Sequence, residues 1–186
     1  MAKVLVPLAD GFEEIEAVTV IDVLRRGGVE VVTASVSAAS GVRGAHGLEV
    51  KADRQFSDAA GEAYDAIILP GGGEGTENLG RSADLISRLR RQADAGRLIC
   101  AICAAPMVLA AAGLLPDGVQ VTCYPTCQMD LDRPWASAPV VHDGSFITGQ
   151  APGTSMLFAL VILQTLAGAP VAQKVARGMV TNVLAE

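Results

Sequence analysis

Short apolar runs that alternate with helix-like segments are the feature that most constrains the fold of this chain. Several helix-like segments end at a glycine, as helices commonly do. A strand–helix–strand succession of this kind implies right-handed crossovers and a parallel sheet covered by helices on both faces. The near-continuous apolar character of the runs agrees with this fold class. The predicted strands are 3–9, 29–36, 65–70, 97–103, 119–124 and 144–149, and the predicted helices are 13–28, 82–96, 105–113 and 153–168.

Two segments interrupt this alternation. Residues 47–53 fit neither pattern cleanly, and residues 139–149 contain Asp143-Gly144, a turn signal that predicts a hairpin. The sequence has no internal repeat, low-complexity tract or linker, and its 186 residues suit one domain. Residues 1–186 are therefore predicted to form a single domain.

Composition excludes several function classes. With 51% hydrophobic residues the chain can bury a large core, yet no apolar run is long enough to span a bilayer, and the N-terminus lacks signal-peptide features. We therefore expect a cytoplasmic protein without a membrane partner. The net charge of −6 argues against nucleic acid as a partner, and the basic stretch 88–92 is interpreted as a solvated helix face. The four cysteines are expected to be free thiols.

Cys103 stands where the predicted strand 97–103 turns into the next helix. In open α/β sheets, functional groups gather beyond the carboxyl ends of the strands. A residue at such a corner is often held in a strained backbone conformation with its side chain lifted clear of the sheet. The helix N-terminus beside it favours the thiolate, which predicts a thiol pKa below the usual value. From position alone, a reactive thiol and a packed apolar cysteine remain equal alternatives.

The other three cysteines are weaker candidates for a reactive thiol. Cys100 and Cys103 form a C-x-x-C pair, but Cys100 lies inside a strand, where residues i and i+3 are roughly 10 Å apart. That separation exceeds the limit of about 7 Å for a disulfide, so Cys100 is predicted to be core. Cys123 is predicted to end a strand beside 97–103. Cys123 and Cys127 are either packing residues or resolving partners for an oxidised Cys103.

Glu16 is the carboxylate that could serve this thiol. It lies one turn before Val20, at the edge of an apolar stripe on the first predicted helix, and should therefore point towards the site. Burial would raise the pKa of Glu16, so that it could donate a hydrogen bond to a thiolate and carry protons. For Glu13 and Glu14, a favourable position at a helix N-terminus is a sufficient explanation.

Glycines follow the predicted strand 65–70 in "ILPGGGEG". Neither the dinucleotide-binding pattern nor the P-loop pattern is present, so a nucleotide cofactor is not expected. The alternative is that the backbone N–H groups of Gly72 or Gly73, together with that of Ala104, form a pocket like an oxyanion hole beside the sulfur.

The segments "LADGFEEIEAV", "YDAIILPGGGEGTENL", "LICAICAAPMVLAAAGLL", "VTCYP" and "APGTSMLFAL" together resemble the ThiJ/PfpI superfamily. Within it they are most similar to the branch of the parkinsonism-associated protein deglycase and its bacterial YajL-type relatives. The resemblance implies a flavodoxin-like three-layer sandwich and a homodimer. It also implies an easily oxidised Cys103 with a protonated Glu16 and backbone donors at Gly72 and Ala104.

Two positions depart from the family pattern. Tyr124 stands where relatives with a third catalytic residue often have histidine, which argues against a Cys–His–acid hydrolase. His46 stands where some relatives have an arginine that reaches the partner subunit's site. His46 is either an imidazole supplied in trans or a surface turn residue, whereas His142 is predicted to be exposed. Other candidate site-lining residues are Cys123 and Pro152.

The resemblance implies a cysteine-dependent enzyme that converts 2-oxoaldehydes in the manner of a glyoxalase, or repairs glycated proteins or nucleotides as a deglycase. Cys103 would be the nucleophile and Glu16 the proton carrier, acting on a small carbonyl substrate without a metal or organic cofactor. The alternative is a redox sensor or chaperone in which Cys103 is oxidised to sulfinic acid and does not turn over. The first helix is also too broadly apolar for one sheet contact, which predicts a two-fold homodimer interface.

Overall fold

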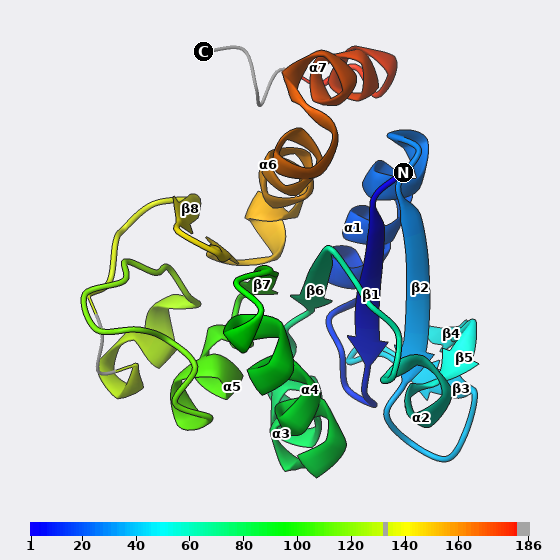
Figure 1. Cartoon of the computed structure of the whole chain (residues 1–186), viewed down its shortest axis with the longest axis vertical. Helices are drawn as coiled ribbons and strands as arrows, with labels where there is room; N and C mark the ends of the chain where they lie inside the picture. Colours follow the sequence, from blue (N-terminus) through cyan, green and yellow to red (C-terminus); the bar gives the residue numbers. More distant parts are fainter. Residues whose placement is uncertain (132–133, 182–186) are drawn as a thin grey trace.

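The fold is built on a seven-stranded sheet, seen in a computed structural model that describes residues 1–131 and 134–181 (Figure 1). The strand order is β5-β2-β1-β6-β7-β9-β8, and only the β8–β9 pairing is antiparallel. A separate hairpin joins β3 to β4. The strands are β1 (Lys3–Leu8), β2 (Glu30–Ser35), β3 (Gly41–Arg43), β4 (Glu49–Lys51), β5 (Arg54–Gln55), β6 (Ala66–Leu69), β7 (Leu98–Ile102), β8 (Val140–Asp143) and β9 (Phe146–Gly149).

Helices cover both faces of this sheet, because alternate side chains of each strand point to opposite faces. Val4 and Val6 of β1 pack in one core cluster with α1 and α6, whereas Leu5 packs in a second cluster with α4 and α5. The predicted three-layer α/β sandwich with a mostly parallel sheet is therefore confirmed. The helices are α1 (Glu14–Arg26), α2 (Phe56–Ala59), α3 (Gly73–Arg81), α4 (Ala83–Asp94), α5 (Pro106–Ala111), α6 (Ser155–Ala167) and α7 (Ala169–Gly178), with 3-10 turns η1 (Pro125–Asp130) and η2 (Pro152–Thr154).

The predicted strand 119–124 is wrong. The position beside β7 is taken by β9, which belongs to the predicted hairpin 139–149. Residues 119–124 contribute only an isolated bridge between Val121 and Trp135, and the Thr122 N–H donates to the hydroxyl of Thr148 at 2.9 Å. Cys123 consequently does not end a strand next to β7. The hairpin itself is confirmed.

The interpretation of 88–92 as a solvated helix face is wrong at three of its five positions, since Arg88, Leu89 and Gln92 are buried. Arg88 is 6% exposed and Gln92 is 1% exposed, because they flank the apolar stripe that Leu85 and Leu89 press against the sheet. Cys100 is fully buried in β7, as predicted. Among residues 1–131 and 134–181, no helix has the length and apolar character needed to cross a membrane.

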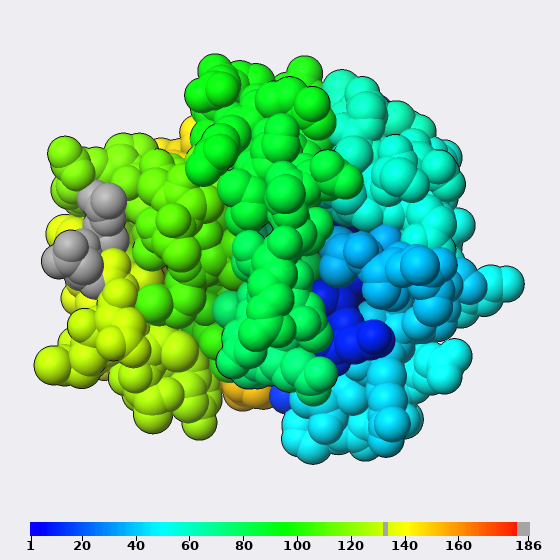
Figure 2. Space-filling view, turned by 90° about the horizontal axis from the view of Figure 1, so that it is seen from below, coloured from blue at the N-terminus to red at the C-terminus, as the bar shows by residue number. Residues whose placement is uncertain are grey.

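The carboxyl ends of three neighbouring strands, β1, β6 and β7, meet at one edge of the sheet. Figure 2 looks onto this edge, where the chain just after β1 lies in a recess between the segments on either side of it. The loop after β1 leads into α1, the loop after β6 into α3 and the corner after β7 into α5. These three connections bring Glu16, Gly71 and Cys103 together.

Candidate active site at the carboxyl edge of the sheet

Cys103 occupies a sharp corner between β7 and α5. Its φ of 64° lies in the left-handed region, which among the described non-glycine residues only Val180 shares. Hydrogen bonds on both sides hold the corner: the Cys103 N–H donates to Gly149 O at 2.9 Å, and Cys103 O accepts from the Tyr124 N–H at 2.8 Å. The strained backbone predicted for this position is confirmed, and the surrounding strands fix it.

Glu16 lies in the first turn of α1 with no exposed surface. Its Oε2 accepts a hydrogen bond from the Gly71 N–H at 2.7 Å, while its Oε1 is buried without a hydrogen-bond partner of ordinary geometry in the described part of the chain. Burial raises the pKa of Glu16 to about 7, against the opposing effect of the Gly71 N–H. The predicted direction of this pKa shift is confirmed, and the carboxyl exchanges its proton near neutral pH.

The sulfur of Cys103 accepts hydrogen bonds from the backbone N–H groups of Gly72 and Ala104, which act to lower the pKa of the thiol. Burial and the adjacent charge of Glu16 outweigh these donors and raise the pKa of Cys103 to about 12. The prediction of a thiol pKa below the usual value is therefore wrong. The two amides do favour a thiolate, but burial removes its hydration and a neighbouring carboxylate repels it.

Cys103 and Glu16 consequently titrate as a coupled pair rather than as two independent groups. One proton leaves the pair near pH 7, and the second is held until about pH 12. Near neutral pH the pair therefore carries one negative charge and one proton. The higher pKa belongs to the thiol, so the remaining proton lies mainly on sulfur; its transfer to the Glu16 carboxylate would place the charge on sulfur, facing the N–H groups of Gly72 and Ala104.

The other candidate residues near the Cys103 corner differ in exposure and in the part of the core they contact. They are Tyr124, Cys123 and Pro152. Tyr124 is 41% exposed, and it is its backbone N–H that bonds to Cys103. Cys123 is fully buried and packs in the core cluster on the opposite face of the sheet from Cys103. Pro152 begins η2, just after β9 ends beside Cys103.

His46 is held by acidic residues of its own chain. Its N–H donates to Glu14 Oε1 at 2.7 Å, its Nδ1 lies 2.9 Å from Glu14 Oε2 and 3.7 Å from Glu13, and its side chain is 73% exposed. Glu14 raises the pKa of His46 through this hydrogen bond. For Glu14, burial acts to raise the pKa, but the bonds from His46 and from the backbone outweigh it and lower the pKa. Sequence reasoning missed that Glu14 ties the β3–β4 turn to α1.

Glu13, Glu14 and His46 also form the one group of metal-ligand side chains found among residues 1–131 and 134–181, with ligand atoms within 4.8 Å of one another. Glu14 and the His46 Nδ1 already satisfy each other through the bonds described above. The cluster therefore serves to fix the turn.

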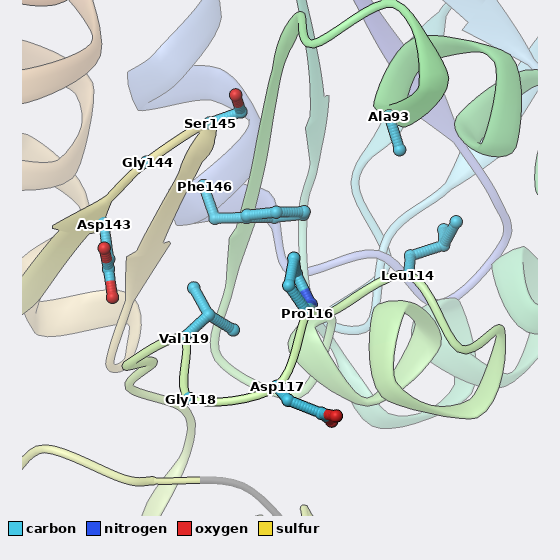
Figure 3. A pocket seen from close by; sticks show the side chains of 10 residues that line it. All are labelled: Ala93, Leu114, Pro116, Asp117, Gly118, Val119, Asp143, Gly144, Ser145 and Phe146. Carbon is cyan, nitrogen blue, oxygen red and sulfur yellow. The ribbon is translucent and has the colours of Figure 1, made fainter.

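Two cavities help to locate the chemistry. A hollow of about 580 Å³ lies beside the site at the carboxyl edge and is lined by Asp10, Arg43, His46 and Glu74 among others. A second cavity of about 450 Å³ lies by the amino ends of β7 and β9, where Phe146 projects between Val119 and Pro116 (Figure 3). Neither cavity is lined by Cys103, but the first lies at the same edge of the sheet as the Cys103–Glu16 pair.

Comparison with known proteins places the chain in a family. The model of the DJ-1/PfpI family matches residues 2–165. This chain belongs to the DJ-1/PfpI family. It is 38% identical to the protein dj-1beta of Drosophila melanogaster over 178 residues, covering 94% of this chain and 95% of that protein. It is 36% identical over 170 residues to the glutathione-independent glyoxalase DJR-1.2 of Caenorhabditis elegans, covering 90% of this chain and 89% of the relative.

Some family members are much longer than this chain. The chain is 40% identical to the DJ-1 homolog B of Arabidopsis thaliana over 171 residues, but it spans only 38% of that protein's length. Among solved structures, oxidized DJ-1 of Toxoplasma gondii superposes with a TM-score of 0.94 at 40% identity, covering 97% of this chain and 99% of that chain. These neighbours confirm the flavodoxin-like fold of the family.

The glycine at position 71 generates a stability prediction. A Cβ there would lie 2.7 Å from the Cys103 Cβ, 2.7 Å from Glu16 Oε2 and 2.8 Å from Ile102 O. Since one of these neighbours is backbone, Gly71→Ala should reduce the free energy of unfolding by about 1–3 kcal/mol, measured by urea denaturation. Gly80→Ala is the control, because a Cβ at this helical position meets nothing within 4 Å. Equal stability of the two variants would contradict the close packing at Gly71.

Glu16 generates a pH-dependent prediction. Its pKa rises from 4.5 to about 7 on folding, so the folded state binds more protons in this window and stability falls as pH rises through it. Above pH 7 the loss is complete and amounts to at most about 3 kcal/mol. Glu16→Gln, which cannot ionise, should unfold like the wild type near pH 4.5 and be more stable at pH 8. Urea denaturation at both pH values tests this, and a difference independent of pH would contradict it.

Proposed function

We propose that the protein is a cysteine-dependent enzyme that converts 2-oxoaldehydes to 2-hydroxy acids, with Cys103 as nucleophile and Glu16 as proton carrier. The observation that carries the proposal is geometric: Cys103 and the buried Glu16 carboxyl meet at Gly71, with the backbone N–H groups of Gly72 and Ala104 facing the sulfur. The C. elegans relative named a glutathione-independent glyoxalase supports the same chemistry. Deglycation of early adducts on proteins or nucleotides would begin from the same attack on a carbonyl carbon.

The geometry supports the following course for methylglyoxal. Cys103 passes its proton to the Glu16 carboxylate, and the resulting thiolate adds to the aldehyde carbon while Glu16 gives that proton to the aldehyde oxygen, which forms a hemithioacetal. The resulting carboxylate of Glu16 takes the proton from that carbon and delivers it to the neighbouring carbonyl carbon by way of an enediol. Water then cleaves the thioester, which regenerates the Cys103 thiol, so that methylglyoxal and water overall yield lactate and one proton. The Gly72 and Ala104 N–H groups would stabilise oxyanions beside the sulfur.

This reaction needs no metal or organic cofactor, since the chain supplies both the nucleophile and the proton carrier. We also propose that residues 1–186 form one domain, supported by the family match over residues 2–165, and that the enzyme works in the cytoplasm. His46, Tyr124, Cys123 and Pro152 remain proposed lining residues.

A redox sensor is the second candidate function. A solved relative with 40% identity is described as oxidized DJ-1, and a thiolate held by two amides can also be oxidised by peroxide to sulfinic acid. In such a sensor Cys103 would accept oxygen and would not turn over substrate. Cys123 packs in the other core cluster, which favours packing over a resolving role for this residue.

Lactate formation from methylglyoxal separates the two functions. Cys103→Ser should reduce turnover to background, and Glu16→Gln should reduce kcat/KM by about 10²- to 10⁴-fold because it removes the proton carrier. Cys127→Ser is the control, since Cys127 is a partly exposed thiol that packs against the other core cluster from Cys103. Turnover by the wild type that does not exceed background, together with peroxide oxidation of Cys103, would favour the sensor.

We further propose that the protein is a homodimer that associates through α1. The exposed apolar side chains of Ile15 (56%), Val18 (49%) and Leu48 (61%) lie on α1 and on the turn that Glu14 ties to it. Ala17, Val20, Val23 and Leu24 of the same helix are buried in the core. Burial of the exposed part in an isologous contact would complete the apolar band predicted from the sequence.

Light scattering at micromolar concentration tests the dimer. The wild type should have the mass of two chains, and Val18→Glu should have the mass of one, because a charge at the centre of an apolar interface is costly to bury. Met129→Glu is the control, since Met129 is 89% exposed but lies in η1, away from α1. A monomeric wild type, or dissociation by both variants, would contradict the proposed interface.

A further inference from the structure

A cavity of about 360 Å³ opens at the edge of the sheet opposite to Cys103, beside the amino ends of β6 and β7. It lies between the α2–β6 connection and the end of α4. Three arginines line it, Arg88 and Arg91 from α4 and Arg97 from the turn before β7. Most of its other wall residues are small, so the guanidinium groups dominate its chemistry.

Each of these arginines is oriented by a backbone carbonyl. Arg88 donates to Glu62 O at 3.1 Å, Arg91 to Ala60 O at 3.3 Å and Arg97 to Tyr64 O at 3.1 Å. A guanidinium has five N–H donors, so each of the three keeps donors beyond that bond. Within residues 1–131 and 134–181, none of them forms an ion pair with a carboxylate.

The positive charge of Arg88 is buried without a counter-ion. Its residue is 6% exposed, and its guanidinium lies 5.8 Å from the centre of the Tyr64 ring. Burial and the neighbouring charges of Arg91 and Arg97 lower the pKa of Arg88, although the coulombic effect of Tyr64 opposes them. Buried charges are normally paired, and here the whole chain carries a net charge of −6. An uncompensated cationic cavity in an acidic protein indicates a missing anion.

The one carboxylate on the cavity wall does not supply that anion. Glu62 forms an ion pair with Lys3 at 2.7 Å and another with Arg54. Those two partners lower the pKa of Glu62, and Arg88 does not contribute to the shift. The charge of Glu62 is therefore committed to a different pair of cations.

Gln92 braces the wall of this cavity. Its Nε2 donates to Tyr64 O at 3.1 Å and to Leu98 O at 3.2 Å, which fixes the orientation of the amide. Its Oε1 is consequently an acceptor, and it is buried without a donor in the described part of the chain. This oxygen has almost no accessible surface, so the role of Gln92 is to hold α4 against the carbonyls of Tyr64 and Leu98 behind the arginines.

We propose that this cavity binds a small phosphate-bearing molecule, with its phosphate held by Arg88, Arg91 and Arg97. Guanidinium forks match the geometry of phosphate oxygens, and a dianion would offset the repulsion among three cations better than a single carboxylate. The cavity lies at the lower end of the volume range of small-molecule pockets, which favours a compact ligand over a polymer.

Isothermal titration of the full chain with inorganic phosphate and with glycerol 3-phosphate, at constant ionic strength in chloride, tests this site. Both probes should bind the wild type, and Arg91→Gln and Arg97→Gln should each weaken binding by about tenfold or more. Tighter binding of the ester would assign the rest of the cavity to the organic part of the ligand. Equal binding of the two probes would assign the site to the phosphate group alone.

Arg90→Gln is the matched control, because Arg90 is exposed on the same helix and does not line the cavity. It removes the same charge and should leave phosphate affinity unchanged. Arg88→Met tests the buried cation: it should abolish binding, and its thermal unfolding shows whether the fold survives. No heat of phosphate binding above that of chloride, or equal weakening by Arg90→Gln and Arg91→Gln, would overturn the proposal.

Discussion

The hydrogen bond from the Gly71 amide to the Glu16 carboxyl is the interaction on which the candidate site depends. It joins the loop after β6 to the first turn of α1, while the same glycine lies against the β7–α5 corner that carries Cys103. Gly71 has no side chain, so the loops after β1 and β6 and the corner after β7 can approach one another closely. The Glu16 carboxyl and the Cys103 thiol then lie near enough to share one proton. The two residues after Gly71 also have defined roles: the Gly72 N–H faces the sulfur, and Gly73 begins α3.

Burial has two opposing consequences for this pair. It raises the pKa of both groups, which keeps a proton in the site near neutral pH, yet it also excludes the water that would otherwise solvate a thiolate. The amides of Gly72 and Ala104 replace part of that hydration with fixed dipoles that need no reorganisation during a reaction. The same arrangement would make Cys103 a nucleophile towards carbonyl carbon and a target for peroxide, so the enzymatic and sensing functions differ in what reaches the sulfur.

The sequence predicted the strands and helices that have a regular apolar pattern, and the loops that follow the carboxyl ends of the strands. Five of the six predicted strands and all four predicted helices exist, and the strand-to-helix corner at Cys103 and the burial of Glu16 follow from the same patterns. The false strand 119–124 failed because an apolar run does not reveal that β9 already occupies the edge of β7. Helix α3 was missed because it begins in a glycine-rich segment of poor helix formers, and tertiary contacts decide it. The Gly71 donor, the His46–Glu14 pair and the burial of Arg88 depend on contacts between distant segments, which no local pattern contains.

The two edges of the sheet differ in charge, and this difference is consistent with the proposed reaction. At the carboxyl edge, Glu16 shares its surroundings with Glu13, and the adjacent hollow carries both signs of charge, with Arg43 and His46 beside Asp10 and Glu74, whereas the amino edge carries the arginine cavity. A 2-oxoaldehyde is neutral and meets no electrostatic barrier at the carboxyl edge. Its product, a 2-hydroxy acid, is an anion formed beside a pair that regains a negative charge at the end of each cycle. Repulsion at short range between the product and this pair would therefore speed release of the product, while the three arginines at the opposite edge would attract an anionic metabolite there.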